Sequence, residues 1–345
     1  MRALRAALCI LTMAAACAAA IPANAGPKSK APRPAATGTT QIGVGHGIAF
    51  LPIYLAQDLK LFEKHGRAAG LPARFALRRF PTAAAMQDAL ARGEIHTATF
   101  GVSALLLVRD GKGGTAEEPT VISGLTTLPL VLLTARRDIR SLADLKPNDR
   151  IAVPALTAPQ VSLLRLHAER TRGVNWERLQ KQIVVMPHED ALAALTGERN
   201  QITAYFASPP FSQLAARDPK ARILLTSADV MDGKASFLVI AATRGRLTAQ
   251  PALAQAVARA IDEAAGIIRN DPRRAAMTYL KYEPSDRLDV RAIETALREI
   301  KDEFGSGVFG VAATAKVLTG ERRLQSPPAS WKDVVAPVLQ SGPGS

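Results

Sequence analysis

The chain has 345 residues, of which 48% are hydrophobic and 21% charged, and 44 Lys and Arg residues against 30 Asp and Glu give a formal net charge of +14. This composition can supply a substantial core and excludes a wholly disordered chain. Both cysteines, Cys9 and Cys17, lie near the N-terminus, which excludes a disulfide framework or a Cys-ligated zinc site in the body of the chain.

The N-terminus has the layout of a secretory signal peptide. Arg2 and Arg5 precede an uncharged apolar run over residues 6–21, and the small residues 23–25 follow it. Cleavage after Ala25 would leave 320 residues without cysteine and with a net charge of +12, because the leader removes 25 residues and two arginines. We therefore expect an exported, periplasmic protein that is stabilised by its core.

Lipid anchoring at Cys17 is the less favoured alternative to cleavage. A bacterial lipoprotein signal normally has a large aliphatic residue three positions before the cysteine, whereas residues 14–16 are all alanine. We therefore expect Cys17 to leave with the signal peptide.

The remaining chain alternates β-type runs with helical patterns. Residues 26–40 combine Pro, Gly, Ser, Thr and basic residues and are typical of a flexible linker, and residues 341–345 form a similar tail. The first set of elements comprises strands at 41–45, 73–77, 96–100, 119–123 and 130–134 and helices at 52–66, 83–92 and 103–109. The second set comprises strands at 150–154, 183–186, 202–205 and 222–225 and helices at 159–172, 189–195 and 209–216.

A last strand at 236–243 is followed by three helices, at 251–269, 272–280 and 285–302. Strands alternating with helices of this size predict an α/β fold with mainly parallel sheets. The two sets predict two lobes, the first formed by residues 41–134 plus 235–340 and the second by residues 135–234. The chain would leave lobe one, build lobe two and return through a second crossover connection.

The basic residues do not predict a nucleic-acid surface. A groove for nucleic acid gathers its cations on one face and interleaves them with aromatic residues. The basic pairs of this chain fall in four separate elements without such aromatics: Arg78–Arg79, Arg136–Arg137, Arg273–Arg274 and Arg322–Arg323. We therefore expect no nucleic-acid partner.

Motifs for catalysis, metals and dinucleotides are incomplete. The sequence GVGHGI at 43–48 lacks the third glycine of the dinucleotide fingerprint, and GVSAL around Ser103 lacks the second glycine of a nucleophile elbow. The five histidines form no HExxH pattern, so we expect no enzyme, no metal site and no cofactor. His46 stands apart because it lies in a glycine-flanked loop at the C-terminal end of a predicted strand, where α/β sheets bind ligands. The other histidines are expected to be structural: His65, His96, His167 and His188.

Several segments, in their order and spacing, resemble one known family. They are GHGIAFLPIYLAQDLKLFEKHG at 45–66, ARGEIHTATFGVSALL at 91–106, SGLTTLPLVLLT at 123–134, IRSLADLKPNDRIAVP at 139–154, MPHEDALAAL at 186–195, QITAYFASPPF at 201–211, ARILLTSADV at 221–230, IDEAAGIIRNDPRRAAMTYL at 261–280 and PPASWKDV at 327–334. The chain thereby resembles the nitrate/sulfonate/taurine-type substrate-binding proteins of ABC importers, which share their fold with thiamine-pyrimidine-precursor binding proteins.

The resemblance implies a two-lobe periplasmic-binding-protein fold of type II with a ligand held in the cleft between the lobes. It places the cleft at five loops, residues 45–51, 101–103, 125–128, 157–160 and 206–209. Four of these loops precede helices, whose N-terminal amides suit an anionic group. The expected ligand-binding residues are Gly45, His46, Phe50, Leu51, Ser103, Thr126, Thr127, Thr157, Gln160, Phe206, Ser208 and Pro209.

The ligand is expected to be a small organic solute that is neutral or singly charged. Taurine and alkanesulfonate binders often present a tryptophan and an acid where this chain has Ser208 and Pro209. The only titratable side chain in the five loops is His46, and Tyr205 directly precedes the last loop. A zwitterion would need a carboxylate, and a dianion usually recruits arginine. Leu105 and Leu128 are expected to add apolar walls.

The resemblance therefore implies a monomeric periplasmic receptor that delivers a solute to an inner-membrane ABC permease. Two alternatives remain open. One is a pyrimidine-precursor binding or synthase-like protein of the same fold, although such a synthase uses a pyridoxal phosphate lysine and a cysteine-rich motif, and the expected mature chain has no cysteine. The other is a solute sensor that docks on a membrane kinase.

Overall fold

The computed structural model describes residues 38–71, 74–156, 158–197 and 201–345. The expected signal peptide, Cys17, most of the expected linker and Thr157 lie outside these residues. Within the part of the chain that is described, no helix is both long and apolar enough to cross a membrane.

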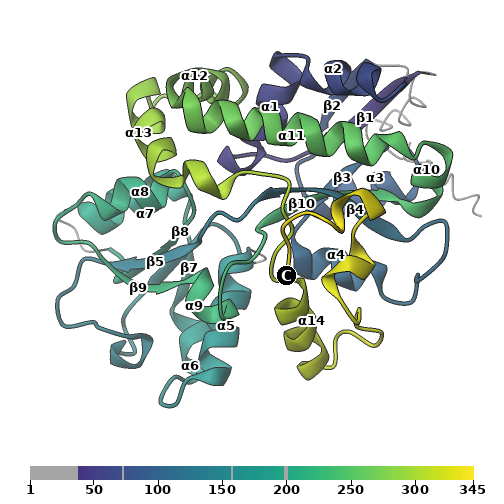
Figure 1. Ribbon diagram of the computed structural model, residues 1–345. Coiled ribbons are helices and arrows are strands. Elements are labelled where there is room, and N and C mark those ends of the chain that lie inside the picture. The colour runs from purple at the N-terminus through teal and green to yellow at the C-terminus, as the bar shows by residue number, and fades with distance from the viewer. Residues whose placement is uncertain (1–37, 72–73, 157, 198–200) are drawn as a thin grey trace, which may run out of the picture. The chain divides into compact units, whose positions relative to one another are not determined.

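Five strands form the first group of the fold (Figure 1). They are β1 (Thr39–Val44), β2 (Arg74–Arg79), β3 (Ala98–Phe100), β4 (Pro119–Thr126) and β10 (Leu238–Thr243). β1 pairs in parallel with β2, and β10 lies antiparallel between β3 and β4. A parallel bridge between Ile42 and Thr97 joins β1 to the segment just before β3, which gives the spatial order β2-β1-β3-β10-β4.

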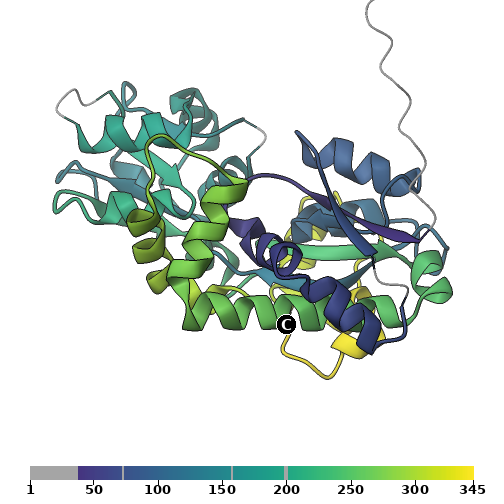
Figure 2. The same cartoon turned by 90° about the horizontal axis from the view of Figure 1, so that it is seen from above.

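Helices pack on both faces of this group because its strands alternate apolar residues toward two cores. Ile240 and Ala242 of β10 belong to one core, and Val239 and Ala241 belong to the other, all with no exposed surface. Figure 2 looks down on the first face, with the long green helix α11 and the purple α1 and α2 toward the viewer. The first core includes α1 (Leu51–Asp58), α2 (Leu61–Ala68), α11 (Ala252–Asn270), α12 (Pro272–Tyr282) and α13 (Val290–Ile300), and the second includes α3 (Ala83–Ala91), α4 (Val102–Arg109) and α14 (Val311–Gly320).

A five-stranded sheet forms the second group, in the order β7 (Ile183–Val185), β6 (Ile151–Val153), β8 (Ala204–Ala207), β5 (Val131–Thr134) and β9 (Arg222–Thr226). β6 is parallel to β7 and β8, whereas β5 is antiparallel to β8 and β9. Tyr205 and Phe206 are fully buried on opposite faces of β8. One face carries α5 (Pro159–Arg170), α6 (Trp176–Leu179) and α9 (Ser227–Met231), and the other carries α7 (His188–Thr196) and α8 (Phe211–Ala216).

The crossover strands differ from the sequence-based expectation. The expected α/β class is confirmed, but β5 and β10 run antiparallel to their neighbours, so both sheets are mixed. β5 was assigned to lobe one, and it pairs with β8 and β9 of the second sheet. Pairing of strands far apart in the chain decides this membership, and the local apolar pattern of residues 131–134 carries no information about it.

Helix boundaries also differ from the predicted ones. The helix expected at 52–66 is divided into α1 and α2, because Lys60 adopts a left-handed conformation with φ 54°. The helix expected at 285–302 starts only at Val290, where the Asp289 side chain accepts a hydrogen bond of 2.7 Å from the Ala292 amide and caps it. Four helices were not predicted: α6, α9, α10 (Arg244–Ala249) and α14.

Candidate functional site

The loops predicted to bind ligand lie at the carboxyl edges of the two sheets. In the first group, β1, β3 and β4 run in one direction, since β10 is antiparallel to β3 and β4 and Ile42 bridges Thr97 in parallel. Residues 45–51, 101–103 and 125–128 therefore follow strands that end at the same edge.

The second sheet repeats this arrangement. β6 and β8 run in parallel, so the chain leaves both strands at one edge, at Pro154 before the predicted loop 157–160 and at Ser208 in the predicted loop 206–209. β5 begins at that same edge, because Val131 is paired with Ala207 in the antiparallel register. The first crossover, residues 127–130, thus leads directly from the carboxyl edge of one sheet to that of the other.

The loop after β1 is shaped by two glycines. A Cβ atom at Gly45 would lie 2.9 Å from the Phe50 ring, and Gly47 has a φ of 104°, so side chains are disfavoured at both positions. Phe50 and Leu51 are buried, whereas the His46 side chain is 59% exposed. Phe50 and Leu51 therefore fix the loop, and His46 presents its ring at the surface.

Glu283, at the C-terminal cap of α12, holds this loop in place. Its carboxylate accepts hydrogen bonds from the Tyr54 hydroxyl at 2.5 Å, the Gly47 amide at 3.2 Å and the Arg79 guanidinium at 3.0 Å, and it lies 3.4 Å from His46 Nδ1. Burial disfavours the charge of Glu283, but the Tyr54 and Gly47 hydrogen bonds and the positive charge of Arg79 outweigh it and hold the pKa of the carboxyl below its usual value. Glu283 is therefore an ionised anchor for the loop.

Hydroxyl side chains line the start of the first crossover and of α4. Ser103 is exposed in the first turn of α4. Thr126 is buried, and its Oγ1 has no hydrogen-bond partner. The Thr127 hydroxyl donates to the carboxylate of Glu303, so it is already occupied. Of the two threonines, Thr126 retains the unused hydroxyl.

In the second sheet, Ser208 contacts a partly buried histidine. Ser208 Oγ lies 2.9 Å from His188 Nε2, and the Tyr205 hydroxyl lies 2.5 Å from His188 Nδ1. The imidazole stacks on the Phe211 ring with a centroid distance of 5.3 Å and an interplanar angle of 15°. Burial lowers the pKa of His188 to about 4, so the ring is neutral near pH 7, with one nitrogen donating and the other accepting.

The remaining predicted residues of the second sheet are mostly buried. Gln160 in the first turn of α5 is 3% exposed, Phe206 is fully enclosed in the core beneath α5, and Pro209 is buried. Thr157 lies outside the described residues. Phe206 thus supports the strand that carries Ser208.

Sequence reasoning missed the residues that surround the predicted loops. Arg79 ends β2, which is parallel to β1, so its position at a carboxyl edge was a usable signal. His188 follows β7 at the corresponding edge of the second sheet, but it was assigned a structural role as the start of a helix. Glu283 is 236 residues from Gly47 in sequence, and no local pattern could have connected them.

The described ranges contain no group of three or more His, Cys, Asp or Glu side chains arranged to hold a metal ion.

The sequence matches the model of the NMT1-like family over residues 34–280. No curated protein gives a significant match. Among solved structures, the periplasmic aliphatic sulphonate binding protein SsuA from Escherichia coli is 18% identical with a TM-score of 0.65, covering 86% of this chain and 97% of that one. The alkanesulfonate-binding protein SsuA from Xanthomonas axonopodis pv. citri, bound to MOPS, is 19% identical with a TM-score of 0.61, covering 87% and 96%.

The periplasmic nitrate-binding protein NrtA from Synechocystis PCC 6803 is 14% identical with a TM-score of 0.52, covering 75% of this chain and 70% of that one. At these identities the likeness establishes the fold, and the expected periplasmic-binding-protein fold is confirmed. Because the family model covers more than half of the chain, the protein belongs to the NMT1-like family.

Proposed function

We propose that the protein is the periplasmic solute-binding component of an ABC import system, which captures a small organic solute and delivers it to a permease in the inner membrane. The observation that carries the proposal is the position of the predicted loops at the carboxyl edges of two sheets that the crossover 127–130 joins directly. Ligands of open α/β sheets bind at such edges. The family membership and the binding functions named for the similar structures support the same function.

The ligand is a neutral or singly charged molecule in this proposal. The charged groups beside the predicted loops have opposite partners: Arg79 pairs with Glu283 at 3.0 Å, and Lys234 pairs with Glu303 at 3.3 Å. A dianion would have to pull one of these cations from its carboxylate, and a strongly charged ligand usually recruits arginine that is free to bind in bidentate fashion.

Three hydroxyls are the proposed ligand donors: Ser103, Thr126 and Ser208. Burial raises the pKa of Tyr205 above its usual range, so its hydroxyl keeps its proton, which it shares between His188 Nδ1 at 2.5 Å and the His188 carbonyl oxygen at 3.3 Å. The neutral imidazole then carries its proton on Nε2 and donates to Ser208 Oγ, which leaves the serine hydrogen for an acceptor atom of the ligand. His188 is thus proposed as a positioning residue for Ser208.

A thermal-shift screen of the purified full chain tests the ligand class. The probes are hexanesulfonate, hexanoate, nitrate, taurine and sulfate. A ligand at a hundred times its Kd should stabilise the native state by about 2.7 kcal/mol. The proposal predicts stabilisation by a singly charged probe, and stabilisation by only taurine or sulfate would overturn the ligand assignment.

Substitutions test the location of the site with the probe that stabilises most. Ser103→Ala should weaken binding by about 2- to 10-fold through loss of one hydrogen bond. Ser208→Trp should abolish binding, because Ser208 already packs 2.9 Å from His188 in this chain and an indole ring has room only in the space beside the loop, which binders with a native tryptophan are shaped to leave open. Thr319→Ala, which removes an exposed hydroxyl from α14, is the matched control and should leave affinity unchanged. Unchanged affinity in both Ser103→Ala and Ser208→Trp would place the ligand elsewhere.

Catalysis is a second candidate, because the 2.9 Å separation of Ser208 Oγ and His188 Nε2 is that of a nucleophile and its base. The third group of this cluster is the Tyr205 hydroxyl, whereas serine hydrolases orient their histidine with a carboxylate. A fluorophosphonate probe separates the two functions. A solute-binding protein should remain unlabelled, and labelling that Ser208→Ala removes would favour the enzyme.

A further inference from the structure

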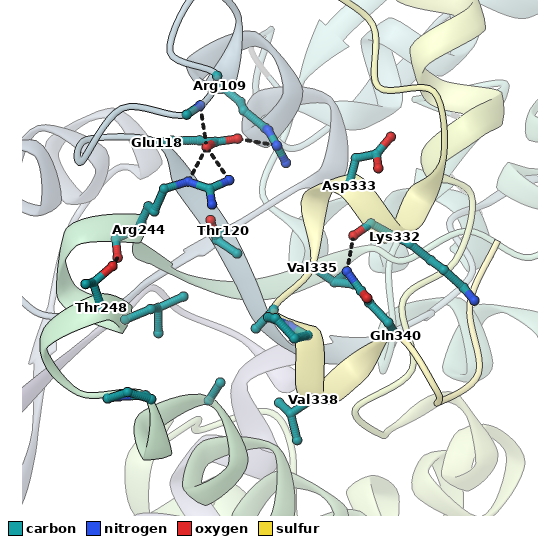
Figure 3. Close-up of a pocket in the computed structure, with 17 residues that line it drawn as sticks. Arg109, Glu118, Thr120, Arg244, Thr248, Lys332, Asp333, Val335, Val338 and Gln340 are labelled. Atoms are coloured by element: carbon teal, nitrogen blue, oxygen red, sulfur yellow. Dashed lines mark hydrogen bonds and ion pairs between the residues drawn. The ribbon is translucent and has the colours of Figure 1, made fainter.

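A pocket of about 740 Å³ opens at the edge of the first sheet opposite the predicted ligand loops. Thr120 of β4 contributes to it from the N-terminal end of its strand, and Arg244 lies just beyond the C-terminal end of β10. The end of α4, the start of α11 and the C-terminal residues 332–340 complete the lining (Figure 3). The volume is in the range of small-molecule sites.

A buried carboxylate lies between two arginines at one end of this pocket. Glu118 has no exposed surface, and Arg244 donates to it from Nε and Nη2 at 2.6 Å each. Arg109 forms an ion pair with the other carboxylate oxygen, and the Gly114 amide donates to Glu118 at 2.9 Å. Figure 3 shows the two guanidinium groups on different sides of the carboxylate. One negative charge thus faces two positive charges.

Three buried polar atoms of this cluster have no hydrogen-bond partner, and one of them, Glu118 Oε1, is engaged by the ion pair with Arg109. Arg109 Nη1 and Thr120 Oγ1 are buried without a hydrogen-bond partner, and the Thr120 residue is 8% exposed. Leaving a buried donor unpaired is unfavourable, and a buried ion cluster is seldom retained for stability alone. Both atoms would be satisfied by an acceptor oxygen placed in the pocket.

The rest of the pocket is apolar on one side and weakly charged overall. Leu247, Pro251, Ala254, Val335 and Val338 supply an aliphatic wall. The complete lining carries three cationic and two acidic side chains, a net charge of +1. Glu118 lies between the two arginines and Asp333 lies on the side of Arg109, so a doubly charged ligand would meet two carboxylates (Figure 3).

We infer that this pocket is a second binding site, separate from the proposed solute site, for a singly charged organic anion with a short aliphatic chain. The anionic oxygens accept hydrogen bonds from Arg109 Nη1 and Thr120 Oγ1, and the aliphatic chain packs on the wall formed by Leu247, Pro251 and Val338. A ligand lacking the anionic group leaves both donors unpaired.

Isothermal titration of the full chain with hexanoate tests the inference, with hexanol and inorganic phosphate as comparison probes. The titration uses the Ser208→Trp background, in which the proposed solute site is blocked. Thr120→Val keeps the shape of the side chain and removes the unpaired hydroxyl, so it should fold normally and bind hexanoate about 2- to 10-fold more weakly.

Val338→Asp adds a negative charge to the pocket at a side chain that is 43% exposed and therefore tolerant of substitution. It should weaken hexanoate binding by more than 10-fold, whereas the uncharged control Val338→Asn should change it by less than 3-fold. Thermal unfolding of each variant verifies that the fold is intact.

Three results together support the second site. Ser208→Trp binds hexanoate at one site that Val338→Asp weakens, hexanol binds much more weakly than hexanoate, and phosphate does not compete. Absence of hexanoate binding in Ser208→Trp, or equal affinities in Val338→Asp and Val338→Asn, would overturn it. Because the proposed solute site is blocked throughout, failure of this inference is distinct from failure of the proposed function.

Discussion

Replacing His188 with glutamine should change how the stability of the protein depends on pH. Burial lowers the pKa of His188 to about 4 in the folded chain, from 6.5 for an unperturbed histidine. As pH falls below 6.5, His188 becomes protonated in the unfolded chain but stays neutral in the folded chain. The free energy of unfolding therefore decreases until the pH reaches the pKa of the folded state. The titration of His188 therefore leaves the free energy of unfolding almost unchanged at neutral pH and lowers it increasingly as the pH falls.

The magnitude follows from the size of the pKa shift. A difference of roughly 2.5 pKa units corresponds to about 3 kcal/mol in full, of which about 2 kcal/mol accumulates between pH 7 and pH 5. His188→Gln removes this titration while retaining an amide that can bond to Ser208 or Tyr205. Between pH 7 and pH 5, the free energy of unfolding of wild type should therefore fall by about 2 kcal/mol more than that of His188→Gln.

Urea denaturation at a series of pH values measures this effect. Thr319→Ala is the matched control, because it removes an exposed hydroxyl from α14 and leaves the surroundings of His188 unchanged, so its stability curve should retain a wild-type slope. Other groups titrate in the same range, and for this reason the readout is the difference between the curves. Parallel curves for wild type and His188→Gln would refute the buried neutral imidazole.

Two further substitutions test the packing that positions the predicted loops. Glu283→Gln removes the charge that anchors the loop after β1 and should lower the free energy of unfolding by about 1–3 kcal/mol. Asp58→Asn breaks a more exposed ion pair and should lower it by less than about 1 kcal/mol. Equal losses in the two variants would contradict the anchoring role of Glu283. Gly124→Ala places a Cβ atom 1.9 Å from the Gly307 carbonyl oxygen and should destabilise by about 1–3 kcal/mol or more, whereas Gly113→Ala meets open space and should be nearly neutral in the same denaturation assay. A stable Gly124→Ala protein would show that these two backbone segments can separate.

The α/β class could be predicted because local apolar patterns alternate along the whole chain. The break between α1 and α2 could not, since the apolar stripe continues through Leu59 and Phe62 while Lys60, a residue without special turn propensity, takes the left-handed conformation. The placement of β5 also depended on partners 70 and more positions away, as in the pairing of Leu133 with Tyr205, which are 72 positions apart.

In the candidate site too, features set by local sequence could be predicted and features set by distant residues could not. The loops could be predicted because strand ends and helix starts are local features, and Ser103 and Ser208 lie in such loops. The groups that hold those loops come from distant parts of the chain, as with Glu283 on the Gly47 amide. His188 was visible in the sequence, but its burial and its contact with Tyr205 depend on tertiary packing.

Native mass spectrometry of the full chain, purified from cells without denaturation, tests the central claim most directly. In the Val338→Asp background, in which the second pocket is closed to anions, our account predicts one small-molecule adduct per chain. The adduct is retained when Thr319→Ala is added and lost when Ser208→Trp is added, and circular dichroism verifies the fold of each variant. An adduct of equal occupancy after Ser208→Trp is added, or a Val338→Asp protein that acquires no adduct even after incubation with hexanesulfonate, hexanoate or nitrate, would contradict a solute-binding role for these loops.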